Sequence, residues 1–161
     1  MRHARKSSYG KKILTEVTVL VKEIMTPNPF CCTADTSLEE VAKAMVEHDC
    51  GEIPIVSSRS DLTLLGVVTD RDIVCRLVAL GKNPVDEPAE SCMSTPVIAV
   101  RESTPIEDCT RIMEENQIRR VPVVNGGGMC CGIVSQADVA KNASRKLTAE
   151  LVKDVSQPAR V

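Results

Sequence analysis

Short apolar runs alternate with amphipathic segments along the chain, and the same order of segments occurs twice. Apolar residues at helical spacing predict one helix in each half, over residues 38–45 in the first and 106–113 in the second. Two short β-rich runs follow, over 53–56 and 64–68 in the first half and over 121–124 and 131–134 in the second. A second helix is predicted to close each half, over residues 70–80 and from 136 to about 145.

The two halves superpose when the sequence is shifted by 68 positions. This shift places Met25 on Met93 and Pro54 on Pro122. Each half begins with a short lead-in segment, over residues 21–25 and 89–93, that ends at a Pro-containing turn before a first short strand. The pattern predicts an α+β fold built from two β-α-β-β-α units in tandem.

Several positions carry local predictions. Thr36 and Thr104 each precede a Glu at the capping-box spacing and are expected to cap their helices. Pro54 and Pro122 lie inside short strands, which favours an edge position or a strand start. Gly66, next to the strand-to-helix junction, would permit close approach of a ligand to the backbone.

The chain divides into five parts. Residues 1–12 carry five Lys or Arg and no acid, and are expected to be a disordered basic arm. Residues 13–80 form the first repeat with a lead-in helix, 81–88 a linker and 89–146 the second repeat. Residues 147–161 are a tail without a functional signal.

Composition narrows the possible functions. Hydrophobic residues make up 43% of the 161, but there is one Phe, one Tyr and no Trp, so the core must be aliphatic. Few aromatics argue against a stacking platform for single-stranded nucleic acid, and a net charge of −2 gives no general attraction to phosphate backbones. The apolar runs are too short to cross a bilayer and no secretory signal is apparent, so a cytoplasmic protein is expected.

Eight cysteines are many for this length. Cys50, Cys75, Cys92 and Cys109 lie in or beside apolar periodic segments and are expected to pack as small hydrophobes. The adjacent pairs 31–32 and 130–131 are more unusual. Neighbouring strand residues point to opposite faces, so neither pair alone suits one metal ion, and no metal site is predicted. Metal or thiol chemistry stays open as an alternative.

The strand-to-helix junctions carry the candidate binding chemistry. Thr69 and Ser135 each start a helix and are followed three positions later by Asp72 and Asp138. The hydroxyl could bond to a phosphate oxygen, and the Asp could accept both hydroxyls of a ribose. The same spacing also fits a capping box that has only a structural role, so the motif alone leaves both interpretations open.

With the strands 53–56 and 121–124, these motifs make the chain resemble a pair of cystathionine-β-synthase (CBS) domains, the Bateman module, over about residues 17–145. The resemblance implies two repeats related by a pseudo-twofold axis and packed through their sheets, with two clefts between them. Such pairs commonly bind AMP, ADP, ATP or S-adenosylmethionine, and often dimerise.

The resemblance also assigns roles by position. Thr69 and Asp72 would bind phosphate and ribose in one cleft, with Arg71 near the phosphate, and Ser135 and Asp138 would do so in the other. The base would lie beside Ile53, Pro54, Val121 and Pro122. Arg119 and Arg120 could neutralise phosphate or be a solvated pair. Because Arg119–Arg120 corresponds to Gly51–Glu52, the two clefts should differ in charge.

No nucleophile with a base and an orienting group is visible, and His48 lies in a helical pattern without an obvious partner. We therefore expect a non-catalytic sensor or regulatory module for an adenosine-containing ligand, with a homodimer and an effector protein as partners. Two alternatives stay open. One is an adaptor that uses the basic arm to bind nucleic acid or a partner, and the other is a metal or thiol sensor that uses the Cys pairs.

Overall fold

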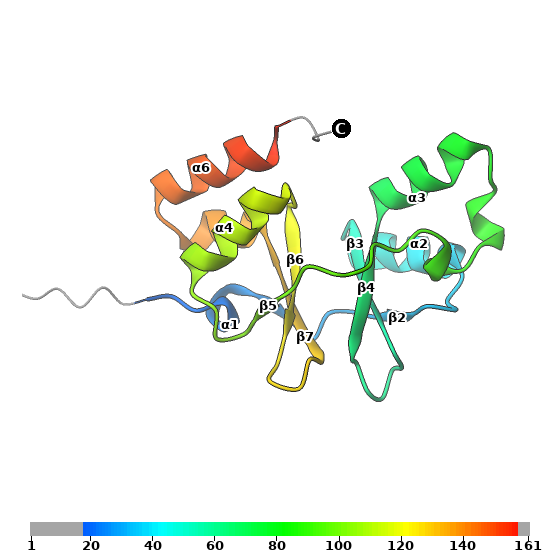
Figure 1. The fold of residues 1–161 in the computed structure, drawn as a ribbon, viewed down its shortest axis with the longest axis horizontal. Coiled ribbons are helices and arrows are strands. Elements are labelled where there is room, and N and C mark those ends of the chain that lie inside the picture. Colours follow the sequence, from blue (N-terminus) through cyan, green and yellow to red (C-terminus); the bar gives the residue numbers. More distant parts are fainter. Residues whose placement is uncertain (1–17, 158–161) are drawn as a thin grey trace, which may run out of the picture.

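The computed structural model describes residues 18–157, which form two similar units side by side (Figure 1). The basic arm over residues 1–12 and the start of the expected lead-in helix lie outside the described residues. The predicted β-α-β-β-α order is confirmed in both units. Among residues 18–157, no helix is long and apolar enough to cross a membrane.

The first repeat contains a three-stranded sheet in the order β2-β3-β4. Its elements are β2 (Cys32–Thr33), α2 (Leu38–Glu47), β3 (Glu52–Val56), β4 (Leu64–Thr69), α3 (Asp70–Arg76) and the 3-10 turn η1 (Val78–Leu80). Strand β2 is parallel to β3, and β3 is antiparallel to β4. Gly81 ends η1 in the left-handed region, at φ 75°, which a glycine adopts without strain.

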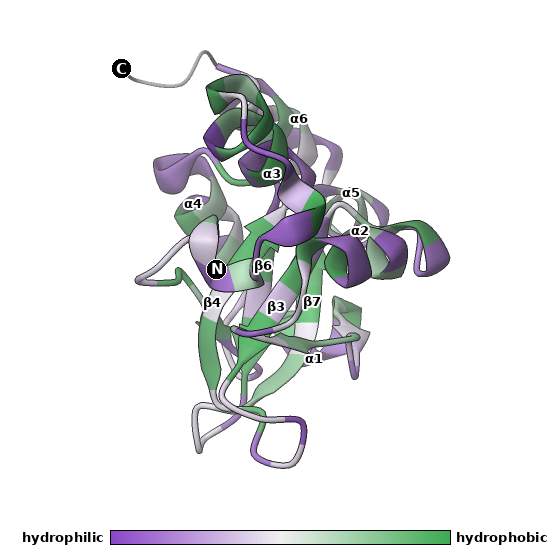
Figure 2. Cartoon of the chain, turned by 90° about the vertical axis from the view of Figure 1, so that its right-hand side faces the viewer, coloured by the Kyte–Doolittle hydropathy of each residue, from purple (hydrophilic) through white to green (hydrophobic). Residues whose placement is uncertain are grey.

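The second repeat contains a four-stranded sheet in the order β1-β7-β6-β5. Its elements are β5 (Val100–Arg101), α4 (Ile106–Asn116), β6 (Arg120–Val124), β7 (Cys130–Ser135), α5 (Gln136–Asn142) and α6 (Arg145–Val155). The lead-in to the first repeat supplies α1 (Val21–Ile24) and β1 (Thr26–Pro27), the linker supplies η2 (Pro84–Asp86), and the lead-in to the second repeat supplies η3 (Ala89–Ser91). In Figure 2 the strands carry much of the hydrophobic colour, whereas the helices show both hydrophilic and hydrophobic residues.

Each lead-in packs on the other repeat. Val21 and Ile24 are buried in the hydrophobic core of the second repeat, and β1 pairs with β7. In return, Ala89 and Cys92 are buried in the core of the first repeat. In Figure 1 the blue segment with α1 lies against the second repeat. Each core is therefore complete only when the other repeat is present.

The backbone bonds that hold the lead-ins are related by the internal repeat. The Val21 amide donates to the Thr104 carbonyl at 2.8 Å, and the equivalent Ala89 amide donates to the Thr36 carbonyl at 2.8 Å. Two more pairs of equivalent backbone bonds flank them. The Lys22 amide donates to the Glu102 carbonyl, as the Glu90 amide does to the Ala34 carbonyl. The Ile106 amide donates to the Val19 carbonyl, as the Leu38 amide does to the Glu87 carbonyl. The exchange is thus a twofold-symmetric feature of the fold.

Glycines in the last strand of each repeat make room for this exchange. A methyl group added to Gly132 would overlap the Met25 side chain, and one added to Gly66 would lie 2.9 Å from the Ser94 carbonyl and 3.2 Å from Met93 Sδ. The expectation that Gly66 admits a ligand is therefore wrong, because the space is filled by the exchanged lead-in.

The helix starts differ from the capping prediction. Ser37, not Thr36, caps α2 and accepts a hydrogen bond from the Glu40 amide. The Thr36 hydroxyl instead accepts from the Thr33 amide and closes the turn after β2. In the second repeat the Thr104 hydroxyl likewise accepts from the Arg101 amide. Pro105 occupies the N-cap of α4 and forms no side-chain capping bond. The Thr side chain is used in the turn before the helix, which the capping pattern could not distinguish.

The edge prediction for the Pro-containing strands is also wrong, since β3 and β6 are inner strands. However, β2 pairs only with Ile55 and Val56, and β5 only with Val123 and Val124. The prolines therefore lie where the strand has a neighbour on one side alone, so the missing N–H breaks no ladder.

The segment expected to be a tail contains helix α6. Its Ser144 cap accepts from the Leu147 amide, and Leu151 and Val155 are buried in the second core against α4. The predicted helix from residue 136 to about 145 therefore ends at Asn142, and a new helix begins three residues later.

The exchange predicts a specific double-mutant result. Gly132→Ala should lower the free energy of unfolding by about 1–3 kcal/mol, because the added methyl overlaps Met25. Met25→Ala should lower the free energy of unfolding by less in the Gly132→Ala protein than in the parent, because the shorter side chain relieves the overlap. Gly126→Ala, which meets no atom within 4 Å, is the matched control. Urea denaturation measures all four variants, and strictly additive losses would contradict the packing described here.

Candidate functional site

A cavity of about 900 Å³ lies between the two repeats. Its walls come from corresponding places in both halves: the starts of β3 and β6, the ends of β4 and β7, and the first turns of α3 and α5. Residues 96–98, just before β5, and the C-terminal end of α6 complete it. Residues to which the resemblance assigned separate clefts, among them Thr69 and Ser135, thus line the same cavity.

Hairpin register explains why the motifs meet the cavity. Glu52 is paired with Thr69 across β3 and β4, and Arg120 is paired with Ser135 across β6 and β7. The first amide of each following helix donates back to the start of the hairpin, from Asp70 to the Gly51 carbonyl at 3.2 Å and from Gln136 to the Arg119 carbonyl at 2.9 Å. In each repeat, these bonds hold the start of the hairpin and the first turn of the following helix together at the edge of the cavity.

Most of the predicted site residues line this cavity. They are Thr69, Arg71, Asp72, Arg119, Arg120, Pro122 and Ser135. Four predicted residues are not among the lining residues. Ile53 and Val121 are buried in the two hydrophobic cores, Pro54 is buried in β3, and Asp138 lies behind Ser135 in the first turn of α5.

Both hydroxyl–Asp motifs form closed capping boxes. The Thr69 hydroxyl donates to Asp72 Oδ2 at 2.6 Å and accepts from the Asp72 amide at 3.1 Å, and the Thr69 amide bonds to the same Oδ2 at 2.9 Å. Ser135 and Asp138 repeat all three bonds, at 2.7, 3.3 and 2.8 Å. The structural interpretation of the motif is therefore correct, and a ligand would use the oxygen lone pairs that these bonds leave.

The two carboxylates differ in their surroundings. Asp72 Oδ1 forms an ion pair with Arg76 at 3.1 Å, and Arg76 also donates to the Cys92 carbonyl at 2.7 Å. At the position corresponding to Arg76, the second repeat has Asn142, which donates to the Asp138 backbone carbonyl instead. Asp72 is thus partly neutralised by its own helix, whereas the corresponding position in α5 carries no cation.

Glu52 is the most unusual group in the cavity wall. Its side chain belongs to a residue only 6% exposed, and its Oε1 has no hydrogen-bond partner. Burial raises the pKa of Glu52 to about 7, the nearby Arg120 opposes this rise, and Asp72 adds to it. A buried carboxylate without a hydrogen-bond partner is costly, so a ligand that donates to it would be favoured.

Arg120 reaches across the cavity from the second repeat. A methyl built on Gly51 of the first repeat would lie 3.4 Å from Arg120 Nη1 and 2.9 Å from Asp70 Oδ2. Glu52 and Arg120 occupy corresponding positions of the two repeats. The cavity wall therefore carries a negative side chain from the first repeat and a positive one from the second at equivalent places. The predicted charge difference between the halves is present within one cavity.

Sequence reasoning missed Glu52 as an individual site residue. Its position beside Thr69 follows from the hairpin register, but its burial depends on packing that no local pattern encodes. The contributions of Val155, at the end of α6, and of Gln157, just beyond it, were also missed, because this segment was expected to be a tail.

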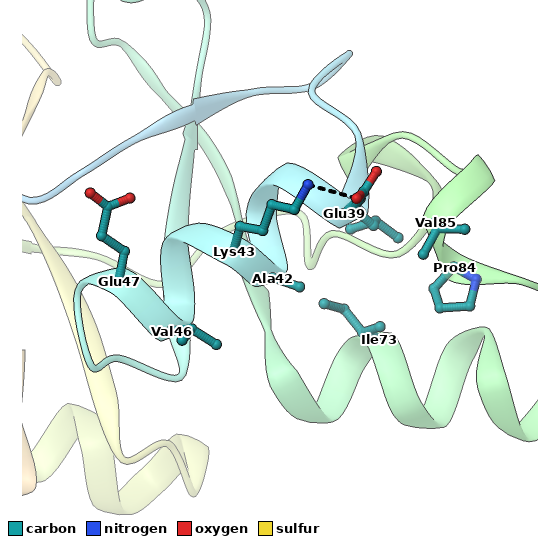
Figure 3. A pocket seen from close by; sticks show the side chains of 9 residues that line it. Glu39, Ala42, Lys43, Val46, Glu47, Ile73, Pro84 and Val85 are labelled. Atoms are coloured by element: carbon teal, nitrogen blue, oxygen red, sulfur yellow. Dashed lines mark hydrogen bonds and ion pairs between the residues drawn. The ribbon is translucent and has the colours of Figure 1, made fainter.

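A second, mainly apolar hollow of about 430 Å³ lies on the outer side of the first repeat, between α2, α3 and η2. Figure 3 shows its aliphatic side chains, including Ala42, Ile73, Pro84 and Val85. Its charged residues include Lys43 and Glu39, which pair at 2.6 Å. We call this surface the α2–η2 groove.

The comparisons with known proteins place the chain in a family. The model of the CBS domain matches twice, over residues 21–79 and 89–145, and the chain therefore belongs to the CBS domain family as a tandem pair. Hypoxic response protein 1 of Mycobacterium tuberculosis is 33% identical over 137 residues, which are 85% of this chain and 94% of that protein. An uncharacterized protein of Methanopyrus kandleri, 34% identical over 118 residues, is matched over 57% of its own length.

Solved structures show the same fold. A crystal structure of Hypoxic Response Protein I with two coordinated zinc ions has a TM-score of 0.71, with 78% of this chain and all of that chain covered. CBSX2 from Arabidopsis thaliana in complex with AMP is 28% identical, with a TM-score of 0.64 and coverage of 76% and 93%. The CBS pair of protein MJ0100, in complex with 5′-methylthioadenosine and S-adenosyl-L-methionine, is 28% identical, with a TM-score of 0.68 and coverage of 76% and 98%.

The Glu52 environment predicts how stability depends on pH. Because the pKa of Glu52 is raised in the folded protein, the folded state binds more protons than the unfolded state between about pH 4.5 and 7. This carboxylate should therefore lower stability as pH rises through that window, by up to about 3 kcal/mol. Glu52→Gln should remove this contribution and be more stable than the parent at pH 8.

Chemical denaturation at pH 5 and pH 8 provides the measurement. Glu47→Gln, an exposed carboxylate on α2, is the control and should follow the parent at both pH values. If Glu52→Gln and the parent lose stability equally between the two pH values, the raised pKa is refuted.

Proposed function

We propose that this CBS pair is a non-catalytic regulatory module that binds an adenosine-containing ligand, AMP, ADP, ATP or S-adenosylmethionine, in the cavity between the repeats. The observation that carries the proposal is that Thr69 and Asp72 of one motif, Ser135 of the other, Arg120 and Glu52, whose Oε1 has no hydrogen-bond partner, all line one cavity of about 900 Å³. Solved CBS pairs with AMP and with S-adenosylmethionine support the choice of ligand class.

The charges suggest how the ligand is oriented. Arg119 and Arg120 supply positive charge on the side of the second repeat and would bind an anionic end, with Arg71 as a further cation at the rim. Glu52 would accept a hydrogen bond from an amino or hydroxyl group. Asp72, which lines the cavity, and Asp138, which is hydrogen-bonded to the lining residue Ser135, are the candidates for the ribose hydroxyls, and the apolar wall at Pro122 and Ile98 would lie against the base.

Regulation would follow from the position of the ligand between the repeats. A ligand that contacts both walls favours the arrangement in which both sets of contacts form, and so shifts the population of inter-repeat arrangements. The output would then pass to a partner protein or to a second copy of the chain. Turnover plays no part in this mechanism.

Isothermal titration calorimetry with AMP, ADP, ATP and S-adenosylmethionine tests the ligand class. At least one of these should bind, and Arg120→Ala should weaken a phosphate-containing ligand about tenfold, since a charge-assisted hydrogen bond is lost. Arg101→Ala on β5, which does not line the cavity, should bind like the parent. Absence of heat and of thermal stabilisation with all four compounds would refute the proposal.

We further propose that the chain forms a homodimer through the α2–η2 groove of two copies. In the second repeat, α6 covers α4 and buries Leu151 and Val155, whereas only the short η2 lies against α2 in the first repeat. Five of the ten exposed large hydrophobic residues in the described chain belong to the helical elements of the first repeat. These are Val46, Val74, Val78, Leu80 and Val85.

Charged substitutions in the groove test the dimer. Val46 is 83% exposed and Val85 48% exposed, so Val46→Asp with Val85→Asp should leave the fold intact and shift the protein to a monomer. Val152→Asp, at a 44% exposed position on α6, is the matched control and should stay dimeric. Sedimentation equilibrium measures the mass, and an unchanged dimer in the double variant would place the interface elsewhere.

A further inference from the structure

The two adjacent cysteine pairs meet at the junction between the repeats. Strand β1 pairs with β7, so that Pro27 lies opposite Gly132, and the Asn28 amide donates to the Cys131 carbonyl at 3.0 Å. On the other side, the Phe30 ring stacks on His48 at the end of α2, with 4.8 Å between ring centroids. Cys31 is therefore held between anchored residues.

Within each pair, one thiol faces the other pair and its neighbour faces a core. Cys32 is buried in the core of the first repeat, and Cys131 packs against the core of the second. The Cys31 thiol donates to the Pro29 carbonyl at 3.3 Å and the Cys130 thiol to the Gly132 carbonyl at 3.9 Å, and the two thiols are near enough for each to shift the pKa of the other. Cys130 is 4% exposed and belongs to neither core cluster, whereas Cys31 is half-buried.

The surroundings restrict what this pair can do. Among residues 18–157, no group of three or more His, Cys, Asp or Glu side chains is arranged to hold a metal ion. Two neighbouring thiols without further ligands can still be oxidised to a disulfide. Two other cysteines have different surroundings: Cys109 is fully buried in the second core, and Cys75 lies exposed on α3, against the expectation that it packs.

We propose that Cys31 and Cys130 are an oxidisable dithiol, which forms a reversible disulfide between the two repeats. The inference is independent of the proposed nucleotide binding. The bond would join the segment that connects the two sheets to the first residue of β7. Ser135, at the cavity, is the last residue of the same strand, so the dithiol and the cavity lie at opposite ends of β7.

The order of events follows from the environments of the two thiols. The nearby Cys130 thiol lowers the pKa of Cys31, because it can donate to the Cys31 thiolate, whereas Cys31 and burial raise the pKa of Cys130. Cys31 is also the more exposed of the two. It is therefore the thiol that meets an external oxidant, and Cys130 resolves the adduct.

With oxidised glutathione, the reaction balances as two exchanges. The Cys31 thiolate attacks one sulfur, the S–S bond of the reagent breaks, and one glutathione thiolate leaves and takes up the proton that Cys31 lost. The Cys130 sulfur then attacks Cys31, the mixed disulfide breaks, and the second glutathione leaves with the proton from Cys130. Two protein thiols are oxidised and one glutathione disulfide is reduced to two thiols.

The test uses the full chain with Cys75→Ser, which removes the exposed thiol and leaves seven of the eight cysteines. After treatment with oxidised glutathione, the thiol count in denaturant should fall from seven to five. Peptide mass spectrometry should find residues 31 and 130 linked, and dithiothreitol should restore seven thiols. The oxidised monomer should migrate faster on a non-reducing gel and melt roughly 5–10 °C higher, because the cross-link closes a long loop.

Cys31→Ser and Cys130→Ser, each in the Cys75→Ser protein, serve as controls and should lose the fast-migrating form. If the buried Cys130→Ser variant does not fold, Cys31→Ser and the peptide map decide the result. Seven thiols after oxidation, a glutathione adduct on Cys31 that never resolves, or a link between other cysteines would each overturn the proposal.

Discussion

The reciprocal exchange of the lead-in segments is the constraint on which the rest of the structure depends. Val21 completes the core of the second repeat and Ala89 that of the first, through equivalent 2.8 Å backbone bonds. Neither repeat has a closed core alone, so the two behave as one folding unit. The cavity between them is consequently a fixed part of the fold and not a gap between independent domains.

This arrangement explains why the site is asymmetric although the fold is symmetric. The backbone bonds, the capping boxes and the glycines that admit Met25 and Met93 repeat in both halves. The side chains facing the cavity do not repeat, since Glu52 corresponds to Arg120. Symmetric main-chain contacts maintain the architecture, and the free side chains at the rim determine which ligand chemistry is favoured.

The exchange also brings together groups that neither repeat holds alone. Strand β1 carries the chain from the second sheet into the first, and this crossing places Cys31 beside Cys130. Arg120 likewise extends from the second repeat to the rim of the first near Gly51. Both contacts join the repeats, one at each end of β7, and both would respond to a change in how the repeats are set against each other.

The sequence by itself determined the repeat, the order of elements and the hydroxyl–Asp junctions, because these depend on local periodicity and on backbone geometry at helix starts. It also indicated that the halves differ in charge. It could not show that Gly66 makes room for Met93, that Pro54 lies in an inner strand, or that α6 belongs to the core, since these depend on contacts between distant segments. Only the tertiary structure brought Thr69 and Ser135 to one cavity, buried Glu52 without a hydrogen-bond partner for its Oε1 and placed Cys31 near Cys130, because packing across the repeats sets the environment of each group.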